Sequence, residues 1–270
     1  MEKRVGIIGF GAIGRSLVDA WSARQVDGHA LVALLVRAHQ RDDAVRSVPP
    51  GVVVCTGIDE FLAHGLHLAV EVAGHGAVRE HGEKILAAGV GLMPVSVGSL
   101  ADAALLQRLE RAASQGGSRM LLPAGAIAGL DGLLSLRQAG LSKVKYTSTK
   151  PPASWKHTPA DGAFRLDELT QATVIFSGTA AEAARLYPKN ANLAAAVALA
   201  GLGLDRTQVE LVADPSITEN IGRIDAEGAY ASLSVVVGGK SAADNPKTSQ
   251  ITGMSVLAAL ENQVGLIAFA

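Results

Sequence analysis

Cysteine and long apolar runs are nearly absent from this sequence. Its 270 residues include one cysteine, Cys55, so no disulfide can form within the chain and a reducing compartment fits best. Cys55 ends the apolar run 52–55, which indicates a small buried hydrophobic side chain rather than a reactive thiol. No apolar run reaches the roughly 18 residues of a membrane span, and residues 1–4 lead into a strand without the apolar core of a signal peptide. These absences predict a cytoplasmic protein with no membrane partner.

An excess of basic charge is absent as well. The chain has 24 lysines and arginines against 25 acidic residues, a formal net charge of −1 at pH 7. Proteins that bind nucleic acids or anionic membranes usually have an excess of basic residues, so we expect neither as a partner. The sequence also lacks an H-E-x-x-H pattern, a cysteine pair, clustered histidines and a G-x-S-x-G turn. Neither a metal centre nor a serine nucleophile is therefore expected.

The first forty residues contain a nucleotide-binding signature. The apolar run 5–8 leads into the turn G-F-G-A-I-G at 9–14, followed by a helix-like segment and a second apolar run at 31–36. A glycine-rich turn between strand and helix lets the backbone approach a pyrophosphate and directs the positive end of a helix dipole toward it. A tight turn without a ligand is the alternative. The residues predicted to contact a dinucleotide here are Gly9, Gly11, Ala12, Ile13 and Gly14.

The residue after the second predicted strand bears on the choice of cofactor. An NAD-specific unit usually places Asp or Glu there, which accepts hydrogen bonds from the ribose hydroxyls. This chain has Val36 and Arg37 instead. An arginine suits the extra phosphate of NADP, so the cofactor is NAD or NADP, whereas a solvated loop cation is the alternative reading of Arg37.

Further apolar runs alternate with helix-like segments up to residue 125. The strands are expected at 52–55, 66–73, 90–98 and 119–122, which predicts a Rossmann-type, doubly wound parallel sheet. His75 follows the fourth predicted strand, at the edge of the sheet where ligands gather. It is either a contact of the nicotinamide or substrate, or a loop histidine without a role.

The pattern changes near residue 140. Residues 143–149 alternate polar and apolar side chains, as a half-exposed antiparallel strand does. Together with strands at 173–177, 208–213, 223–227 and 230–237 and helices at 179–186 and 192–200, this predicts a second α+β domain with a mostly antiparallel sheet. The open face of that sheet is a plausible dimer surface.

A final helix is expected from an N-cap at Asn245, with Pro246 at its first position, to about Glu261. Such a helix commonly packs back on the nucleotide domain. The predicted domains are therefore residues 1–125 plus 246–270, which bind the dinucleotide, and residues 126–245, which carry the substrate site and the dimer contact.

The densest polar stretch of the second domain is Y-P-K-N-A-N at 187–192. Its cation and amides could hold a carboxylate, and Lys189 could serve as a general acid if burial lowered its pKa. A turn in which Asn190 or Asn192 only caps the next helix is the alternative. Other cations in loops, such as Lys150, favour an anionic substrate.

Taken together, the motifs resemble those of the L-aspartate dehydrogenases, NAD(P)-dependent enzymes that interconvert L-aspartate with oxaloacetate and ammonia through iminosuccinate. The resemblance covers essentially the whole chain. The motifs that carry it are the glycine turn, E-V-A-G-H at 71–75, S-V-G at 96–98, A-G-A-I at 124–127, K-P at 150–151, Y-P-K-N-A-N at 187–192, G-L-D-R-T at 203–207, A-D-P at 213–215 and N-P-K-T-S at 245–249.

The resemblance implies a homodimer whose substrates are ammonia and a small dicarboxylic amino or keto acid. It also implies that Ala126 and Asn192 contact the cofactor. The family's catalytic histidine stands in a segment like E-N-[VI]-H, whereas this chain reads E-N-I-G at 219–222, so Gly222 occupies the histidine position. A positioned acid or base contributes about 10²- to 10⁴-fold in rate, so this departure predicts either a slow enzyme or a proton role for Lys189 or His75.

Two other readings of Gly222 follow. A lost imidazole would widen the pocket for a bulkier substrate of an imine or carbonyl reductase, or the chain would be a catalytically silent dinucleotide-binding redox sensor. The histidine is either lost by evolution or removed deliberately.

Overall fold

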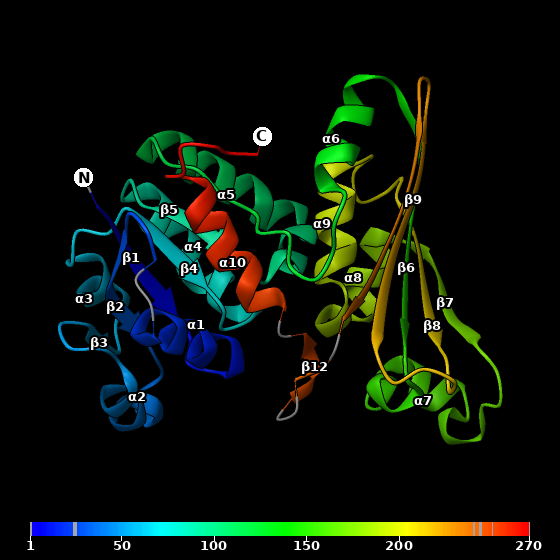
Figure 1. The fold of residues 1–270 in the computed structure, drawn as a ribbon, viewed down its shortest axis with the longest axis horizontal. Coiled ribbons are helices and arrows are strands. Elements are labelled where there is room, and N and C mark those ends of the chain that lie inside the picture. The colour runs from blue at the N-terminus through cyan, green and yellow to red at the C-terminus, as the bar shows by residue number, and fades with distance from the viewer. Residues whose placement is uncertain (1, 24–25, 240, 243–244, 250, 270) are drawn as a thin grey trace. The chain divides into compact units, whose positions relative to one another are not determined.

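The computed structural model describes residues 2–23, 26–239, 241–242, 245–249 and 251–269. The chain forms two compact units, which are drawn in Figure 1. The first unit comprises residues 1–125 together with 252–270, and the second comprises residues 126–251. None of the helices in these described ranges is long and apolar enough to span a bilayer.

The first unit is built on a five-stranded sheet in the order β3-β2-β1-β4-β5, and every neighbouring pair of strands is parallel. This confirms the predicted Rossmann-type architecture. Apolar side chains dominate the strands because helices cover both faces of such a sheet. The strands are β1 (Lys3–Ile8), β2 (His29–Leu35), β3 (Val53–Cys55), β4 (Leu68–Glu71) and β5 (Gly91–Pro94).

Helices connect these strands and enclose the core. Val5, Ile7 and Val70 of the sheet pack with Leu17 of α1 and with Val256 of α10, which Figure 1 draws in red. The C-terminal helix therefore belongs to the same core as the N-terminal strand. The helices of this unit are α1 (Ala12–Ala23), η1 (Ala38–Gln40), α2 (Arg41–Ser47), α3 (Ile58–Leu62), α4 (His75–Ala87), η2 (Val97–Ala101), α5 (Ala103–Gly116) and α10 (Ile251–Asn262).

Of two local predictions in this unit, one is confirmed and the other is wrong. Cys55 is completely buried, and burial raises the pKa of its thiol to about 11, which confirms an inert side chain. The predicted strand 119–122 is wrong, because only Met120 forms a bridge, to Leu92 of β5. Leu121 still donates its N–H to the carbonyl of Leu92, but the pairing extends no further, and Pro123, three residues beyond Met120, has no N–H to donate to a ladder.

The second unit contains a five-stranded sheet in the order β10-β9-β6-β8-β7. Only the central β6–β8 pair is parallel, so the prediction of a mostly antiparallel sheet is confirmed. Each predicted strand is present, with shifts of a few residues at its ends. The strands are β6 (Leu141–Lys150), β7 (Thr173–Thr179), β8 (Gln208–Ala213), β9 (Asn220–Gly228) and β10 (Ser232–Gly239).

Helices cover one face of this sheet, as Figure 1 shows for α6, α8 and α9. The core between them includes Trp155, Tyr146 and Leu211. Helix α8 begins at a capping box in which Thr179 and Glu182 satisfy each other's backbone N–H groups. The helices are α6 (Leu130–Gln138), which the sequence patterns did not predict, η3 (Pro152–Trp155), α7 (Pro159–Ala163), η4 (Leu166–Glu168), α8 (Ala180–Leu186), η5 (Pro188–Asn190) and α9 (Asn192–Ala200).

The predicted start of the last helix is wrong. Helix α10 begins at Ile251, and residues 245–249 instead form strand β12 (Asn245–Ser249), which pairs with β11 (Ser241–Ala242). An N-P sequence fits a helix start, but each strand of a two-stranded ribbon is an edge, where proline is also tolerated.

Candidate active site

The glycine turn of the first unit is built so that no side chain can stand in it. Gly9 has a φ of +106°, and a Cβ there would lie 2.8 Å from the Cα of Ala73. A Cβ on Gly14 would lie 2.2 Å from the carbonyl oxygen of Gly9. The first and third glycines therefore permit a sharp turn and close packing of α1 on β1, which is the arrangement of a dinucleotide-binding loop.

A pocket of about 420 Å³ opens at this turn, at the carboxyl ends of β1, β2 and β4. Gly9 and Gly11 line it, and a Cβ on Gly11 would meet no atom within 4 Å. Ala12 and Ile13 form the first residues of α1, directly beyond the turn. The middle glycine thus leaves space at a helix N-terminus, so these residues fit the pyrophosphate of a dinucleotide.

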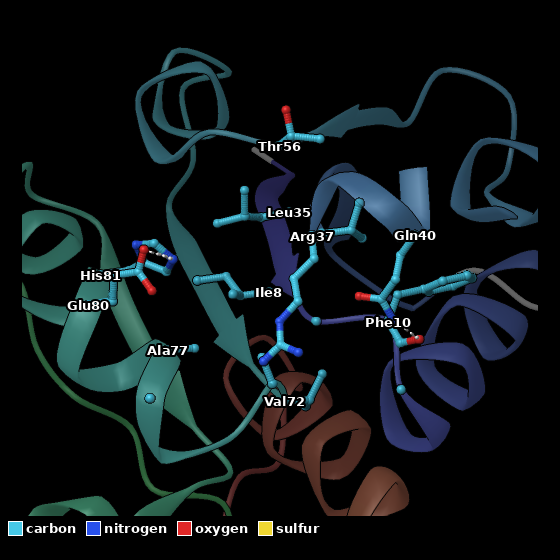
Figure 2. Close-up of a pocket in the computed structure, with 15 residues that line it drawn as sticks. Ile8, Phe10, Leu35, Arg37, Gln40, Thr56, Val72, Ala77, Glu80 and His81 are labelled. Atoms are coloured by element: carbon cyan, nitrogen blue, oxygen red, sulfur yellow. Dashed lines mark hydrogen bonds and ion pairs between the residues drawn. The ribbon is translucent and has the colours of Figure 1, made fainter. Parts of the chain in front are cut away.

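Arg37 lines the same pocket after the end of β2. Its side chain is exposed and extends across the pocket toward Val72, as Figure 2 shows. Among the described residues we find no ion pair that holds this guanidinium. Gln40, which also lines the pocket, donates a hydrogen bond to the carbonyl oxygen of Phe10 and so joins η1 to the glycine turn.

Glu71 and His75 follow β4 on the same edge. The Glu71 carboxylate is fully buried and accepts hydrogen bonds from the backbone N–H groups of Ala73, Gly74 and Ser96. Burial raises the pKa of Glu71, and these hydrogen bonds partly offset that effect. Glu71 therefore fixes the loop beside the pocket. His75 is the first residue of α4, and the pocket is lined by the two residues after it.

A second group of polar side chains lies in the second unit, on the helix-covered face of its sheet. Tyr146, Ser148 and Lys150 alternate along β6 and so point to one face. Gly222 of β9 pairs with Ser148 across the sheet. We call this face, with these four residues, the covered face.

Position 222 is closed by its neighbours. A Cβ on Gly222 would lie 3.0 Å from Cδ1 of Ile127 and 3.2 Å from the hydroxyl oxygen of Tyr146. Tyr146 is buried, which raises the pKa of its phenol, and it hydrogen-bonds to the side chain of Ser148. A missing imidazole has therefore left no open space in the Cβ direction, contrary to the widened pocket considered above.

Lys150 ends this row of side chains. Its Nζ donates to Oδ1 of Asn190 at 3.0 Å and lies 5.2 Å from the centre of the Trp155 ring. In the described chain no carboxylate forms an ion pair with it, and burial lowers its pKa to about 8. The alternative in which Asn190 or Asn192 caps α9 is wrong, because Ala191 is the N-cap of that helix and no side chain caps it.

The beginning of β9 supplies another polar atom. Oδ1 of Asn220 is buried and has no hydrogen-bond partner in the described structure. Asn220 lies two residues before Gly222 and thus on the covered face, next to the pair Thr149–Ile221 at the end of β6. A buried carbonyl oxygen without a donor is rare and marks a place where a ligand can bind.

The other predicted residues of this unit lie in the segments around the covered face. Ala126 precedes Ile127, the residue that packs toward Gly222. Asn192 begins α9, two residues after Asn190, and Lys189 is exposed in η5. The structure thus places Gly222, Ala126, Lys189 and Asn192 in one unit and His75, Arg37 and the glycine turn in the other.

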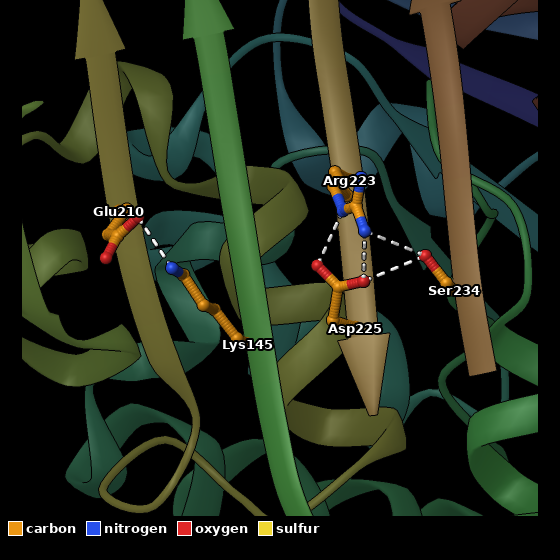
Figure 3. Close-up of polar contacts among 5 residues, drawn as sticks. All are labelled: Lys145, Glu210, Arg223, Asp225 and Ser234. Atoms are coloured by element: carbon orange, nitrogen blue, oxygen red, sulfur yellow. Dashed lines mark hydrogen bonds and ion pairs between the residues drawn. The ribbon is translucent and has the colours of Figure 1, made fainter. Parts of the chain in front are cut away.

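The opposite, open face of the sheet has a different electrostatic character (Figure 3). Arg223 donates two hydrogen bonds to Asp225, at 2.6 and 2.8 Å, and Ser234 donates to the same carboxylate. Lys145 forms an ion pair with Glu210 at 2.7 Å. These cations are neutralised within the sheet, whereas Lys150 on the covered face is not.

Sequence reasoning missed the roles of Lys150, Asn190 and Asn220 as a group. In the sequence Lys150 stands out only as one of several cations in predicted loops. The period-two pattern of 143–149 already placed residue 150 on the same face as Tyr146, which is the signal that could have separated it from the others.

Two family models match the chain. The model described as "Aspartate dehydrogenase, C-terminal" matches residues 131–263. The model described as "Homoserine dehydrogenase, NAD binding domain" matches residues 9–123. The first unit is thus an NAD-binding domain, in agreement with the glycine turn and its pocket.

Individual relatives extend this likeness over both units. An L-aspartate dehydrogenase of Cupriavidus necator is 46% identical, over 96% of this chain and 97% of the relative. An L-aspartate dehydrogenase of Pseudomonas aeruginosa is 50% identical, over 74% of this chain and 75% of the relative. The crystal structure of an aspartate dehydrogenase from Thermotoga maritima matches with a TM-score of 0.77 and 27% identity, over the whole of both chains. The chain therefore belongs to the L-aspartate dehydrogenase family.

Proposed function

We propose that this protein interconverts L-aspartate with oxaloacetate and ammonia through iminosuccinate, with NAD or NADP as the oxidant. The observation that carries the proposal is the 46% identity to an L-aspartate dehydrogenase over nearly the full length of both chains. The glycine turn supports it, because its backbone geometry fits a dinucleotide.

The residues of the first unit would bind the cofactor. The backbone of Gly9 and Gly11 and the start of α1 at Ala12 and Ile13 would hold the pyrophosphate, with Gly14 keeping α1 close beneath it. Bound nicotinamide supplies a hydride acceptor for the Cα of aspartate. Arg37 would bind the additional phosphate of NADP, so both cofactors are accepted.

The residues of the second unit would bind the substrate. Exposed Lys189 would attract a carboxylate of the dicarboxylic acid, and Ala126 and Asn192 would contact the cofactor, as the resemblance to the family implies. Gly222 provides no acid or base. Lys189 and, in the first unit, His75 are the two residues that the sequence offers for the proton role.

The alternatives have less support. A reductase for bulkier substrates needs space at position 222, and Ile127 and Tyr146 occupy it. A catalytically silent redox sensor needs no polar group on the covered face, yet Lys150 and Asn220 place an ammonium without a carboxylate and an amide oxygen without a donor there.

We further propose a cytoplasmic homodimer that assembles through the open face of the second sheet. Val236 of β10 and Val174 of β7 lie on exposed strand positions, with 56% and 48% of their surfaces accessible, and Val236 pairs with Arg223, one of the neutralised cations. Light scattering coupled to gel filtration should give twice the monomer mass, and Val236→Glu should shift the protein toward monomer. A monomeric wild type would contradict the dimer.

The activity is tested by NADH and NADPH consumption with oxaloacetate plus ammonia, followed by a panel of other keto acids. We expect turnover with oxaloacetate and at least tenfold less with monocarboxylic or bulkier keto acids. Fluorescence titration with NADH runs in parallel. Cofactor binding without turnover on any acid would reject the enzyme and favour the sensor.

A further inference from the structure

Proton transfer is the part of the proposed reaction for which position 222 offers no side chain. Lys150 is the titratable residue of the covered face whose ammonium has no carboxylate partner in the described structure. It ends the row Tyr146–Ser148–Lys150. Ser148 lies directly opposite Gly222, and the next residue on this face of β6, Lys150, is about 7 Å further along the strand. That distance is within the reach of a lysine side chain.

We infer that Lys150 is the proton carrier of this enzyme, and that the Oδ1 atoms of Asn190 and Asn220 hold its amine and the substrate's nitrogen beside it. The inference rests on the proposed function. Asn190 accepts one hydrogen bond from Nζ, which leaves the remaining positions of the amine for substrate and water. Asn220 contributes a buried acceptor that lacks a donor, and an amine or iminium nitrogen would supply one.

The surroundings of Lys150 suit exchange of a proton near neutral pH. Burial alone accounts for the lowering of its pKa to about 8, so no neighbouring carboxylate stabilises the ammonium. Asp214, for example, donates its backbone N–H to the carbonyl of Lys150, and its carboxylate accepts from Ser216 instead. The charged and titratable groups on the surrounding elements are Asp214 after β8, Glu219 before β9, Lys189 in η5 and Tyr187 before η5.

After hydride loss, the neutral Lys150 amine takes a proton from water while the water oxygen bonds to the iminium carbon and the C=N electron pair moves to nitrogen. The Lys150 ammonium then protonates that nitrogen. The C–N bond breaks with its electron pair on ammonia, and the amine takes the hydroxyl proton as the carbonyl forms. Oxaloacetate and ammonia leave, the last proton passes to solvent, and no electrons are exchanged in these steps.

The test compares Lys150→Arg and Lys150→Met with Lys84→Met, a control that removes an exposed lysine paired with Asp59 in the first unit. We expect wild-type kcat for aspartate oxidation to rise with pH around a midpoint near 8. Lys150→Arg keeps a cation but does not titrate, so kcat should fall at least about 100-fold and the midpoint should disappear, with KM changed only a few-fold. Lys150→Met should also lose the rise of kcat with pH near pH 8, which we call the kcat limb.

Asn190→Asp is the sharper variant. It places a carboxylate about 3 Å from Nζ, which should raise the pKa of Lys150 and move the kcat limb upward by about one pH unit or more. A merely structural Asn190 would change kcat without moving the limb. ¹³C NMR of lysine Cε reads the same titration without turnover, with a midpoint near 8 that is lost in Lys150→Arg and raised in Asn190→Asp.

The outcomes separate this inference from the proposed function. Wild-type turnover with the limb retained in Lys150→Arg would make Lys150 a carboxylate anchor and overturn the proton role alone. NADH binding by the wild type without turnover on aspartate or oxaloacetate would overturn the function, and the proton role with it.

Discussion

The two units build their sites from different materials. In the first unit the site is backbone, six consecutive residues whose glycines leave room for a phosphate group. In the second unit the proposed site consists of side chains, and Lys150, Asn190 and Asn220 come from three elements separated by up to 70 residues. A backbone site depends on the absence of side chains, whereas a side-chain site depends on a few polar groups whose burial costs folding free energy. The two should therefore respond in opposite ways to substitution.

The largest effect is expected from Gly14→Ala in the first unit. The new Cβ would meet the Gly9 carbonyl at 2.2 Å, and backbone atoms cannot move aside as a flexible side chain can. We expect a loss of about 3 kcal/mol in unfolding free energy and loss of NADH binding. Urea denaturation and NADH fluorescence titration measure the two effects.

Gly11→Ala is the matched control, because a Cβ there meets no protein atom within 4 Å. Its stability should equal that of the wild type, while NADH affinity falls at least tenfold because the methyl group stands where the pyrophosphate approaches. Equal stability of Gly14→Ala and Gly11→Ala would show that the turn is not as tightly closed as its geometry indicates.

The second unit should show the reverse, a gain in stability when its site is removed. Burial lowers the pKa of Lys150 from the ordinary 10.5 to about 8, which corresponds to about 3 kcal/mol against the folded state when the lysine is charged. Lys150→Met relieves this cost and loses the hydrogen bond to Asn190, worth about 1 kcal/mol. A net gain of about 2 kcal/mol is expected at pH 7.

The pH dependence gives this prediction its sign. Below pH 8 the lysine is charged in both folded and unfolded chains, so the full penalty applies. Between pH 8 and 10.5 the folded chain loses its proton first and the penalty fades. The advantage of Lys150→Met should therefore be largest below pH 8, and above pH 10.5 it should turn into a loss of about 1 kcal/mol, because only the missing hydrogen bond to Asn190 remains. Urea denaturation at pH 7 and above pH 10.5 measures the difference. A pH-independent difference would mean that Lys150 is not desolvated.

The same contrast explains what could be predicted from the sequence. The glycine turn can be predicted from the sequence because its residues are consecutive and the turn has a steric requirement for glycine. The strands of the second sheet can be predicted because polar and apolar residues alternate along them. The cluster around Lys150 cannot be predicted in this way, because the register that brings residue 150 beside the start of β9 is set by pairing across the sheet.

Two local errors have similar causes. Residues 119–122 are apolar enough for a strand, but whether a sixth strand forms depends on pairing with β5 along its whole length, and only Met120 pairs. The sequence at Asn245 and Pro246 satisfies helix-start preferences, yet it lies in β12. Local preference is overridden in both places by pairing between strands, which the local pattern does not specify.

Cofactor choice should respond less strongly than stability. Arg37→Asp replaces the cation of the pocket with an acid that repels a phosphate and accepts from a ribose, so the ratio of NADP to NAD affinity should fall about tenfold or more. Fluorescence titration with NADH and NADPH measures the ratio. Arg41→Asp, an exposed arginine at the start of α2, is the control with an unchanged ratio. An equal change of this ratio in both variants would show that it comes from the altered net charge and not from a contact between Arg37 and the phosphate.

The smallest effect is expected where the resemblance to the family places a histidine. Gly222→His alone should destabilise the protein by about 1 kcal/mol or more, because its Cβ meets Cδ1 of Ile127 at 3.0 Å. Ile127→Val removes that one methyl group. In the double variant Gly222→His/Ile127→Val we expect kcat to rise about tenfold, with a new limb near the ordinary imidazole pKa of about 6.5.

Gly222→Ala/Ile127→Val is the matched control, since it has the same Cβ and the same vacated space but no imidazole. If it gains as much as the histidine variant, the gain comes from packing rather than from proton transfer. If the histidine variant keeps its limb near 8, Lys150 continues to move the proton with an imidazole present. Proton transfer would then depend on Lys150 of β6 rather than on position 222. The first unit would contribute a backbone site for the cofactor, and the second unit would contribute the side chain that carries out the chemistry.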